Sequence, residues 1–444
     1  MSAVICFALF MGAMVACLVT GYDMVWALLF GIALFLLRGK RNGYSWRDMW
    51  KAMWGEGSKI LSLIVIFMLI GVITGLWRSC GTIAFFIYYG IQIITPKLFI
   101  LIAFFLTCLL SYALGTSFGV VGTAGIILMA MARSGGVSEV VTAGTVLAGA
   151  FFGDRCSPVS SSASLVAALT ESSLYDNLRM MRRTGWLPLG ISVAIYVVLS
   201  VTHPLTQMNH EMLDALQESF VISPWTVLPA IIMLVLPLLK MSIRHTLEIS
   251  IVSAIAITVF VQHMSLWETA KVLIMGYHPA SGALADIVAG GGAVSMVTCS
   301  LLVFTATMYS GLLDGTKVLL GAKGLVEKLA DRAGLFVATA VVSIACGMVL
   351  CNQCVVVVMG DQLVANSYRK RGVSHEEKAL DIENSGIVIS ALIPWNIACG
   401  IPLQMMGVGS AAVIYAVFLY MMPLCYLFTK HKFYPKQEER NDIL

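Results

Sequence analysis

The chain has 444 residues, of which 59% are apolar and 12% charged, and its formal net charge is +4. Soluble domains carry about 25% charged residues, so lipid is the expected solvent around most of this chain. The small, dispersed net charge argues against nucleic-acid binding. The absence of a Gly-x-x-x-x-Gly-Lys-Ser/Thr loop argues against an ATP-driven pump.

Long and almost uncharged apolar runs follow one another along the chain. Several approach the ~20 residues that cross a bilayer as a helix. Lipid cannot satisfy exposed backbone groups, so a helical bundle is the expected architecture. We predict an all-α, polytopic membrane protein with roughly 10–14 transmembrane helices. The runs are 4–19, 60–77, 98–114, 187–201, 247–261, 294–313, 335–350 and 411–428.

Lysine and arginine residues gather in alternate loops. Of the 28 such residues, 23 fall in one set of loops and four in the other, and Arg155 lies inside a membrane segment. The positive-inside rule places the larger set, and with it both chain ends, in the cytoplasm. We expect a multi-pass protein of the cell inner (plasma) membrane. The cytoplasmic groups lie at 38–59, 179–183, 240–244, 317–332, 369–378 and 430–440.

The two halves of the sequence resemble each other at a constant offset of 236 residues. Arg133-Ser-Gly-Gly-Val-Ser meets Arg369-Lys-Arg-Gly-Val-Ser, and Pro158 meets Pro394. Equivalent loops differ in their positive charge, as expected of inverted-topology repeats with broken helices at the substrate site. The alternative is accidental similarity among apolar helices. We predict a first membrane repeat at 1–205, an external linker at 206–224, a second, inverted repeat at 225–430 and a cytoplasmic tail at 431–444.

Two short polar stretches, one in each half, separate apolar runs and are expected to be helix breaks or hairpin tips. Cys351 and Cys354 lie in the second of them, but no further Cys or His pair exists to complete a zinc site. Packing or pore lining is therefore the expected role of these cysteines. The stretches are Gly115-Thr116-Ser117-Phe118-Gly119 and Cys351-Asn352-Gln353-Cys354.

A third polar stretch, residues 153–162, should break a membrane helix, because it combines Pro158 with a glycine and four serines. Its freed carbonyls and the hydroxyls of Ser157, Ser160 and Ser161 are hard oxygen ligands, which suit a small cation. Asp154 supplies negative charge. Arg155 can pair with an acid or hold a substrate carboxylate. The alternative is that Asp154 and Arg155 end a loop at the membrane surface.

The matching break in the second half, residues 390–396, contains Pro394, Trp395 and Asn396. Glu383 and Asn384 precede it, and Glu383 is a candidate proton carrier because an acid at membrane depth is costly and usually functional. For Glu383 and Asp381 the alternative is an acid in the first turn of a helix, stabilised by the helix dipole.

Asp361 is a third candidate acid, present only in the second half of the sequence, since its repeat partner is Gly125. Its alternative role is a polar contact between helices.

Gly153-Asp154-Arg155-Cys156-Ser157-Pro158 resembles the Gly-Asp-Lys-x-Ser-Pro motif of NhaC-type Na⁺/H⁺ antiporters, part of the wider ion transporter superfamily. Residues 381–396 resemble a second block of that family, and Asp361 resembles a further acid. The resemblance implies a secondary transporter that exchanges Na⁺ for H⁺. Arg155 replaces the family's lysine, and Ser160–Ser164 replace its Ser-Asp-Thr-Thr-Asn, which suits an organic substrate with a carboxylate.

We therefore predict a secondary active transporter that is Na⁺/H⁺ antiporter-like and works by alternating access at mid-membrane broken helices. The alternative is a Na⁺- or H⁺-coupled transporter of an amino acid or small organic acid. An intramembrane enzyme is disfavoured because no histidine accompanies Asp154 and the serines.

The expected partners are a small ion or small molecule and the lipid bilayer, and nucleic acid is not expected. The formation of a homodimer is left as an open alternative. No cofactor is expected beyond Na⁺ or H⁺ as coupling ion. Asp154 and Asp361 are the candidate Na⁺ ligands. The full set of candidate site residues is Thr116, Ser117, Asp154, Arg155, Ser157, Ser160, Ser161, Asn352, Gln353, Asp361, Glu383, Asn384, Trp395 and Asn396.

Overall fold

The computed structural model describes residues 3–93, 96–158, 160–204, 216–239, 241–279 and 289–434. Helices dominate the described residues, whose bridge pairing is limited to one isolated bridge between Tyr277 and Gly290. The predicted all-α class is confirmed. Most of the predicted linker and tail, at 205–215 and 435–444, lies outside the described residues.

The first half of the chain forms helices over each of its predicted apolar runs, and α11 extends well beyond the run at 187–201. Three segments in this half are long and apolar enough to cross a membrane, namely Leu61–Ser79, Ser117–Ser134 and Leu174–Thr202. The elements are α1 (Ala3–Thr20), α2 (Met24–Arg41), α3 (Trp46–Lys59), α4 (Leu61–Ser79), α5 (Thr82–Ile93), η1 (Pro96–Leu98), α6 (Phe99–Leu114), α7 (Ser117–Val120), η2 (Val121–Gly125), α8 (Ile126–Ser134), α9 (Glu139–Cys156), α10 (Ser161–Thr170) and α11 (Leu174–Thr202).

The second half adds two such segments, Ile243–Phe260 and Ala293–Gly315. Shorter apolar helices occur in both halves, so the predicted number of spans stays a prediction. The elements are η3 (Pro224–Val227), α13 (Leu228–Leu238), α14 (Ile243–Phe260), α15 (Leu266–Met275), η4 (Ala293–Met296), α17 (Val297–Gly315), η5 (Val318–Ala322), α18 (Lys323–Ala333), α19 (Leu335–Leu350), α20 (Gln353–Lys370), α21 (His375–Ile382), η6 (Glu383–Ile387), α22 (Val388–Ser390), α23 (Ile397–Met406), η7 (Ser410–Tyr415) and α24 (Val417–Phe433).

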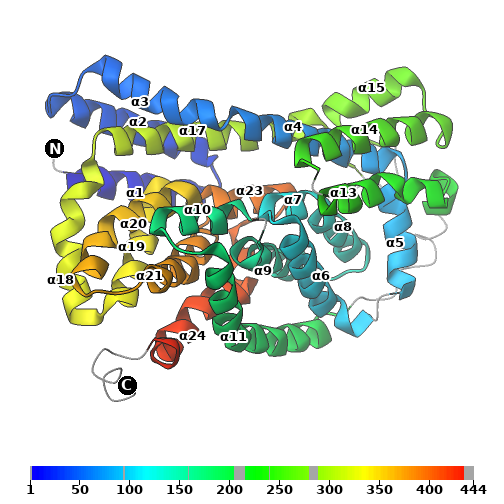
Figure 1. Cartoon of the computed structure of the whole chain (residues 1–444). Helices are drawn as coiled ribbons and strands as arrows, with labels where there is room; N and C mark the ends of the chain where they lie inside the picture. Colours follow the sequence, from blue (N-terminus) through cyan, green and yellow to red (C-terminus); the bar gives the residue numbers. More distant parts are fainter. Residues whose placement is uncertain are drawn as a thin grey trace.

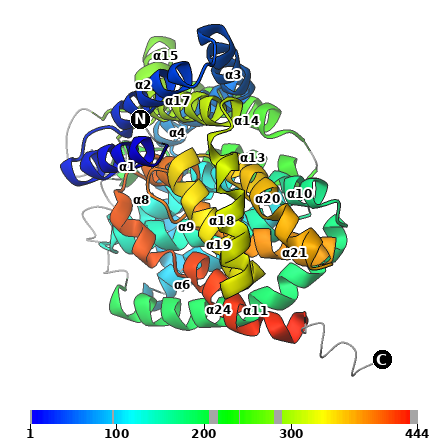
Figure 2. The same cartoon turned by 90° about the vertical axis from the view of Figure 1, so that its left-hand side faces the viewer.

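Helices from both halves build each of two layers. Helices α1–α4 pack with α13–α15 and α17 in a layer at the top of Figures 1 and 2. Helices α6–α11 and α19–α24 form the larger part below it, which we call the core. The first helix belongs to the upper layer, and the last helix lies at the bottom of the core (Figure 1).

The predicted helix breaks are confirmed. Helix α9 ends at Cys156 and α10 begins at Ser161, while α22 ends at Ser390 and α23 begins at Ile397. Pro158 and Pro394 lie in the two gaps, where their missing N–H groups cost no helical hydrogen bond. The boundaries of α6 and α19, and of α10 and α23, also differ by the offset of 236 that relates the two halves of the sequence.

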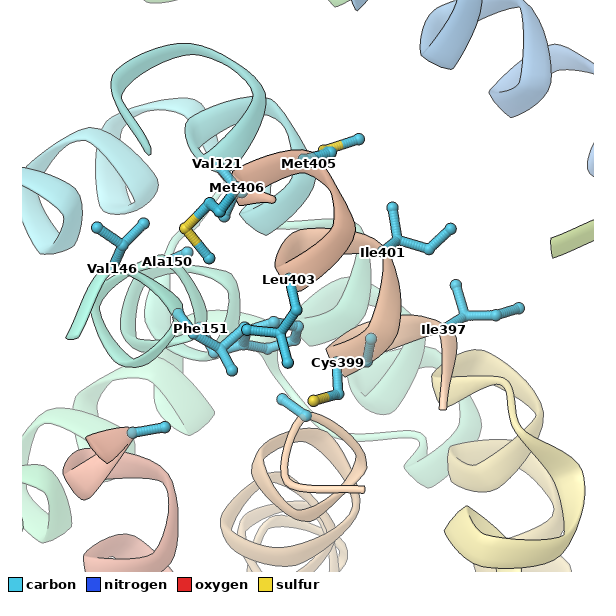
Figure 3. Packing of buried hydrophobic residues seen from close by; sticks show 14 of the residues in the cluster. Val121, Val146, Ala150, Phe151, Ile397, Cys399, Ile401, Leu403, Met405 and Met406 are labelled. Carbon is cyan, nitrogen blue, oxygen red and sulfur yellow. The ribbon is translucent and has the colours of Figure 1, made fainter. Parts of the chain in front are cut away.

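The short helices after the breaks are exchanged between the halves. Helix α10 packs on α20 and α21, whereas α23 packs on η2, α8 and α9, as Figure 3 shows for the contact with Val121 and Ala150. Arg133 Nη2 donates to the Met406 carbonyl at the end of α23 (2.8 Å). His375 Nδ1 lies 2.6 Å from the Thr170 carbonyl at the end of α10. Reciprocal contacts of this kind are what a two-fold relation produces; the inverted orientation of the halves stays a prediction.

Glycines hold α9 close to α6. A Cβ atom at Gly149 would lie 2.0 Å from Thr107 Oγ1 and 2.9 Å from the Phe104 carbonyl oxygen. One at Gly153 would lie 2.2 Å from the backbone of Tyr112. This close approach fixes the end of α9, and therefore the position of the residues at its break, against the hairpin tip after α6.

We expect the substitution Gly149→Ala to destabilise the protein by about 1–3 kcal/mol, because the added methyl group overpacks a contact that includes backbone. The matched control is Gly190→Ala in α11, where no atom lies within 4 Å of the added Cβ and alanine favours the helix by up to about 1 kcal/mol. Thermal denaturation of detergent-purified protein measures both changes. Equal midpoints for the two variants would contradict the close packing of α6 on α9.

Candidate ion-binding site

The site is built where α9 stops and α10 starts. Ser157 has extended backbone (φ −84°, ψ 138°), and Pro158 follows it, so the helix cannot continue. Ser160 then caps α10, because its Oγ accepts hydrogen bonds from the backbone N–H groups of Ser162 (3.1 Å) and Ala163 (3.3 Å). The break thus brings serine hydroxyls and a helix N-terminus to the end of α9.

Asp154 lies in the last turn of α9 and is 4% exposed, so it is neither in a loop nor at the protein surface; its depth in the membrane stays a prediction. The Ser162 hydroxyl donates to Asp154 Oδ2 (3.0 Å). Ser160 Oγ lies 3.2 Å from Oδ1 and 2.5 Å from the Asp154 main-chain oxygen. The Gln353 side chain interacts with the same carboxylate from the first turn of α20. All of these partners are neutral.

Arg155 is 1% exposed, and its guanidinium group spans three elements. Nε and Nη2 both donate to Asn384 Oδ1, at 3.1 and 2.5 Å. Nη2 also lies 3.3 Å from Thr184 Oγ1 and from the Met181 carbonyl of α11. The ion pairs found in the described part of the chain do not include Arg155. Its charge is therefore solvated by neutral oxygens.

Glu383 begins the π-helical turn η6, which continues α21. Its side chain is fully buried, and neither carboxylate oxygen has a hydrogen-bond partner among the described residues. Asn384 Nδ2 is also without a partner there. The Glu383 carboxylate interacts electrostatically with Arg155 and Asp154. Single π-helical turns occur frequently at functional sites, and this one places an unsatisfied acid beside two charged groups.

Asp381 has a different environment. It accepts hydrogen bonds from Tyr368 Oη (2.5 Å) and Tyr426 Oη (2.9 Å) and pairs with Lys430. The first turn of α21 contains Glu376 and Glu377 instead, so neither Asp381 nor Glu383 is a first-turn acid of this helix. Asp381 joins α20, α21 and α24 and has the contacts of a structural residue.

Asp361 lies in α20 and pairs with Lys378 of α21 at 2.8 Å. This is the helix–helix contact named above as its alternative role. Asp361 follows Gln353 by eight residues, which is about 12 Å along a helix, so the structure does not bring it to the carboxylate of Asp154. Its predicted role as a Na⁺ ligand stays a prediction.

The structure gathers six of the candidate residues, leaves Asp361 within α20 and places the remaining seven at or near helix ends. Asp154, Arg155, Ser160, Gln353, Glu383 and Asn384 form one buried cluster. Thr116, Asn352 and Asn396 cap α7, α20 and α23. Ser157 donates a hydrogen bond to the Tyr112 carbonyl, and Trp395 donates one to the Met348 carbonyl. Ser117 is buried in the first turn of α7, whereas Ser161 is exposed.

Two residues that hold the site, Ser162 and Thr184, lie outside the predicted set of site residues. Ser162 could have been found, since it lies two residues after the capping residue Ser160, where a side chain can reach back to the preceding acid. Thr184 comes from α11, 29 residues after Arg155, and no sequence pattern indicates that contact.

The chemistry of the cluster suits a monovalent cation or a proton. The described residues contain no group of three His, Cys, Asp or Glu side chains that could hold a metal ion. The acids Asp154 and Glu383, with hydroxyl, amide and carbonyl oxygens around them, offer the hard ligands that an alkali cation prefers.

Comparison with known proteins places this chain among transporters. A family model described as "Na+/H+ antiporter family" matches residues 1–168 and 149–429. The chain is 27% identical over 395 residues to the Na(+)/H(+) antiporter NhaC of Alkalihalophilus pseudofirmus. This alignment covers 87% of this chain and 85% of the relative. It is 27% identical to the malate-2H(+)/Na(+)-lactate antiporter of Bacillus subtilis over 81% of this chain and 79% of the relative. It is 25% identical to the arginine/ornithine antiporter ArcD of Halobacterium salinarum over 85% of this chain and 80% of the relative.

Lys430 should contribute to the stability of the protein, because it neutralises the buried carboxylate of Asp381. Its side chain is 16% exposed and that of Asp381 is 0% exposed, so Lys430→Met leaves a buried carboxylate without its cation and should cost about 3–5 kcal/mol of stability. Lys370→Met is the control, because its pair with Glu327 is largely exposed and is worth about 1 kcal/mol or less. Thermal unfolding compares the two variants, and a Lys430→Met protein as stable as the control would contradict a structural role for Asp381.

Proposed function

This chain belongs to the Na⁺/H⁺ antiporter family, and from that premise we propose that it exchanges Na⁺ for H⁺ at the cluster of Asp154, Arg155 and Glu383. It is a multi-pass membrane protein and a secondary antiporter. The membrane is the plasma membrane in this proposal, and both chain ends are cytoplasmic, because the positive residues of alternate loops then lie inside.

The observation that carries the proposal is the unsatisfied carboxylate of Glu383. An isolated ionised carboxylate away from water is very unfavourable, so such a group either takes up a proton or binds a cation. In this chain the buried acid Asp381 already has Lys430 as its cation, whereas Glu383 has neither a hydrogen-bond partner nor a direct ion pair among the described residues, although Arg155 lies near enough to interact with its charge. A proton and Na⁺ are then alternative occupants of one site, and that competition is the chemical basis of exchange.

The surrounding residues support the binding of a cation stripped of water. Asp154 is held by Ser162 and lies beside Gln353, so its oxygens are oriented before an ion arrives. The break between α9 and α10 supplies further oxygens that a continuous helix would use for its own hydrogen bonds. Alternating access requires that the protein has two conformations with the site open to opposite sides, and broken helices that end at the site can change its exposure.

We expect Asp154→Asn and Glu383→Gln each to abolish exchange, because each removes an acid that must alternate between a proton and Na⁺. Reconstituted protein is assayed for Na⁺-dependent collapse of an imposed pH gradient, at about pH 6–9, which brackets the range of perturbed carboxyl groups. Glu248→Gln is the control, since Glu248 forms an exposed pair with Arg244. Full activity in either site variant, with normal insertion, would remove that residue from the mechanism.

A second candidate function is exchange of a small organic acid or amino acid. It is favoured by the buried guanidinium of Arg155, a good ligand for a carboxylate, and by the relatives named for malate, lactate, arginine and ornithine. In this function a substrate carboxylate replaces Asn384 as the acceptor of Arg155. Thermal-shift measurements with Na⁺, carboxylic acids and amino acids separate the two functions, because only a ligand that binds the folded protein raises its unfolding temperature.

A further inference from the structure

We propose that Arg155 limits the ion site to one monovalent cation at a time, so that the antiporter exchanges one Na⁺ for one H⁺ and moves no net charge. This inference rests on the proposed function and concerns the stoichiometry of the same site. Arg155 acts in it as a fixed positive charge that determines how many protons or Na⁺ ions the neighbouring acids can hold.

The first step is that Arg155 keeps its charge. A guanidinium group is not deprotonated in proteins, and here it is fixed by Asn384, Thr184 and the Met181 carbonyl. All three are neutral acceptors, so none of them cancels the charge. Asn384 receives two of the donors on one oxygen, which also holds the guanidinium against η6 and hence near Glu383.

The second step is that the two acids remain available. The lysines that neutralise acids elsewhere in the core, Lys430 and Lys378, pair directly with Asp381 and Asp361. By contrast, the partners of the Asp154 carboxylate are two serines and Gln353, and Glu383 has no hydrogen-bond partner in the described part of the chain. The cluster therefore holds one permanent positive charge and two acids that are free to bind an ion.

The third step is a charge count. With both acids ionised the cluster carries a net charge of −1, because Arg155 offsets one of them. A buried cluster of low dielectric constant is most stable when neutral, and one proton or one Na⁺ achieves this. A second proton would leave a net positive charge in the same surroundings. The Na⁺-loaded and the proton-loaded forms are therefore both neutral, and the membrane potential has no charge to act on during exchange.

The test measures the gradients at which exchange stops in reconstituted protein. A Na⁺ gradient and an H⁺ gradient that are each about tenfold store equal free energy. A one-for-one exchanger therefore shows no net flux when both ions are about tenfold more concentrated on the same side of the membrane, because the two ions must move in opposite directions. We expect this balance point, and the same balance point when valinomycin and a K⁺ gradient impose a membrane potential. A balance point that moves with the potential would overturn the inference while leaving Na⁺/H⁺ exchange intact. A complete absence of Na⁺-coupled flux would overturn the proposed function as well.

Two variants then test the role of Arg155 itself. Arg155→Lys keeps a cation and should keep the wild-type balance point and pH profile. Arg155→Gln removes the charge, so the acids hold an additional proton and Na⁺ competes only at more alkaline pH. The quantity measured is the pH at which Na⁺ gives half of its maximal stabilisation of the purified protein. We expect this pH to rise by about one unit or more, the effect of a single nearby charge. An unchanged midpoint in Arg155→Gln, or an equal shift in Arg155→Lys, would show that Arg155 only supports the fold.

Discussion

An ionised carboxylate that is removed from water must be neutralised, and the arrangement of the core depends on how each of its acids meets this requirement. Asp381 has a lysine and two tyrosines, and Asp361 has a lysine. Asp154 has only neutral donors, and Glu383 has no hydrogen-bond partner among the described residues. The first two acids join helices, whereas the second two keep the capacity to bind an ion from outside.

The broken helices make the unpaired acids tolerable. Where α9 stops, Ser160 and Ser162 provide hydroxyl groups at the N-terminus of α10, which is also the positive end of that short helix dipole. The exchange of α10 and α23 between the halves then brings residues that are far apart in the sequence to one place. Arg155 of the first half meets Asn384 of the second, 229 positions later. A movement of α9 relative to η6 would therefore change the geometry of an ion site at this contact.

Much of this arrangement follows from sequence patterns. Pro158 and Pro394 predict both breaks because each combines a missing backbone N–H with polar neighbours, whereas Pro188, Pro402 and Pro423 lie inside helices. The polar residues Ser160, Asn352 and Asn396 have the side chains that cap helices. The burial of Asp154 at the end of a helix likewise follows from the apolar residues around it. These are local effects, and local effects can be read from neighbouring residues.

The partners of the acids could not be predicted in the same way. Glu383, Asp381 and Asp361 look alike in the sequence, as acids within or beside apolar segments, yet their environments differ. Lys430 reaches Asp381 across 49 positions, and Thr184 reaches Arg155 from another helix. Such contacts depend on tertiary packing, for which the sequence has no periodic signal. Only the side chains that surround each acid in the structure show whether it is a structural residue or lacks a hydrogen-bond partner.

Exchange by this protein requires that protons and Na⁺ compete for Asp154 and Glu383. The most direct measurement is the release of protons when Na⁺ is added to purified protein in weakly buffered detergent solution. We expect about one proton to be released for each Na⁺ bound, by the charge balance of the buried site, and no release from protein that carries both Asp154→Asn and Glu383→Gln. Na⁺ binding without proton release, or equal release from the double variant, would contradict this competition.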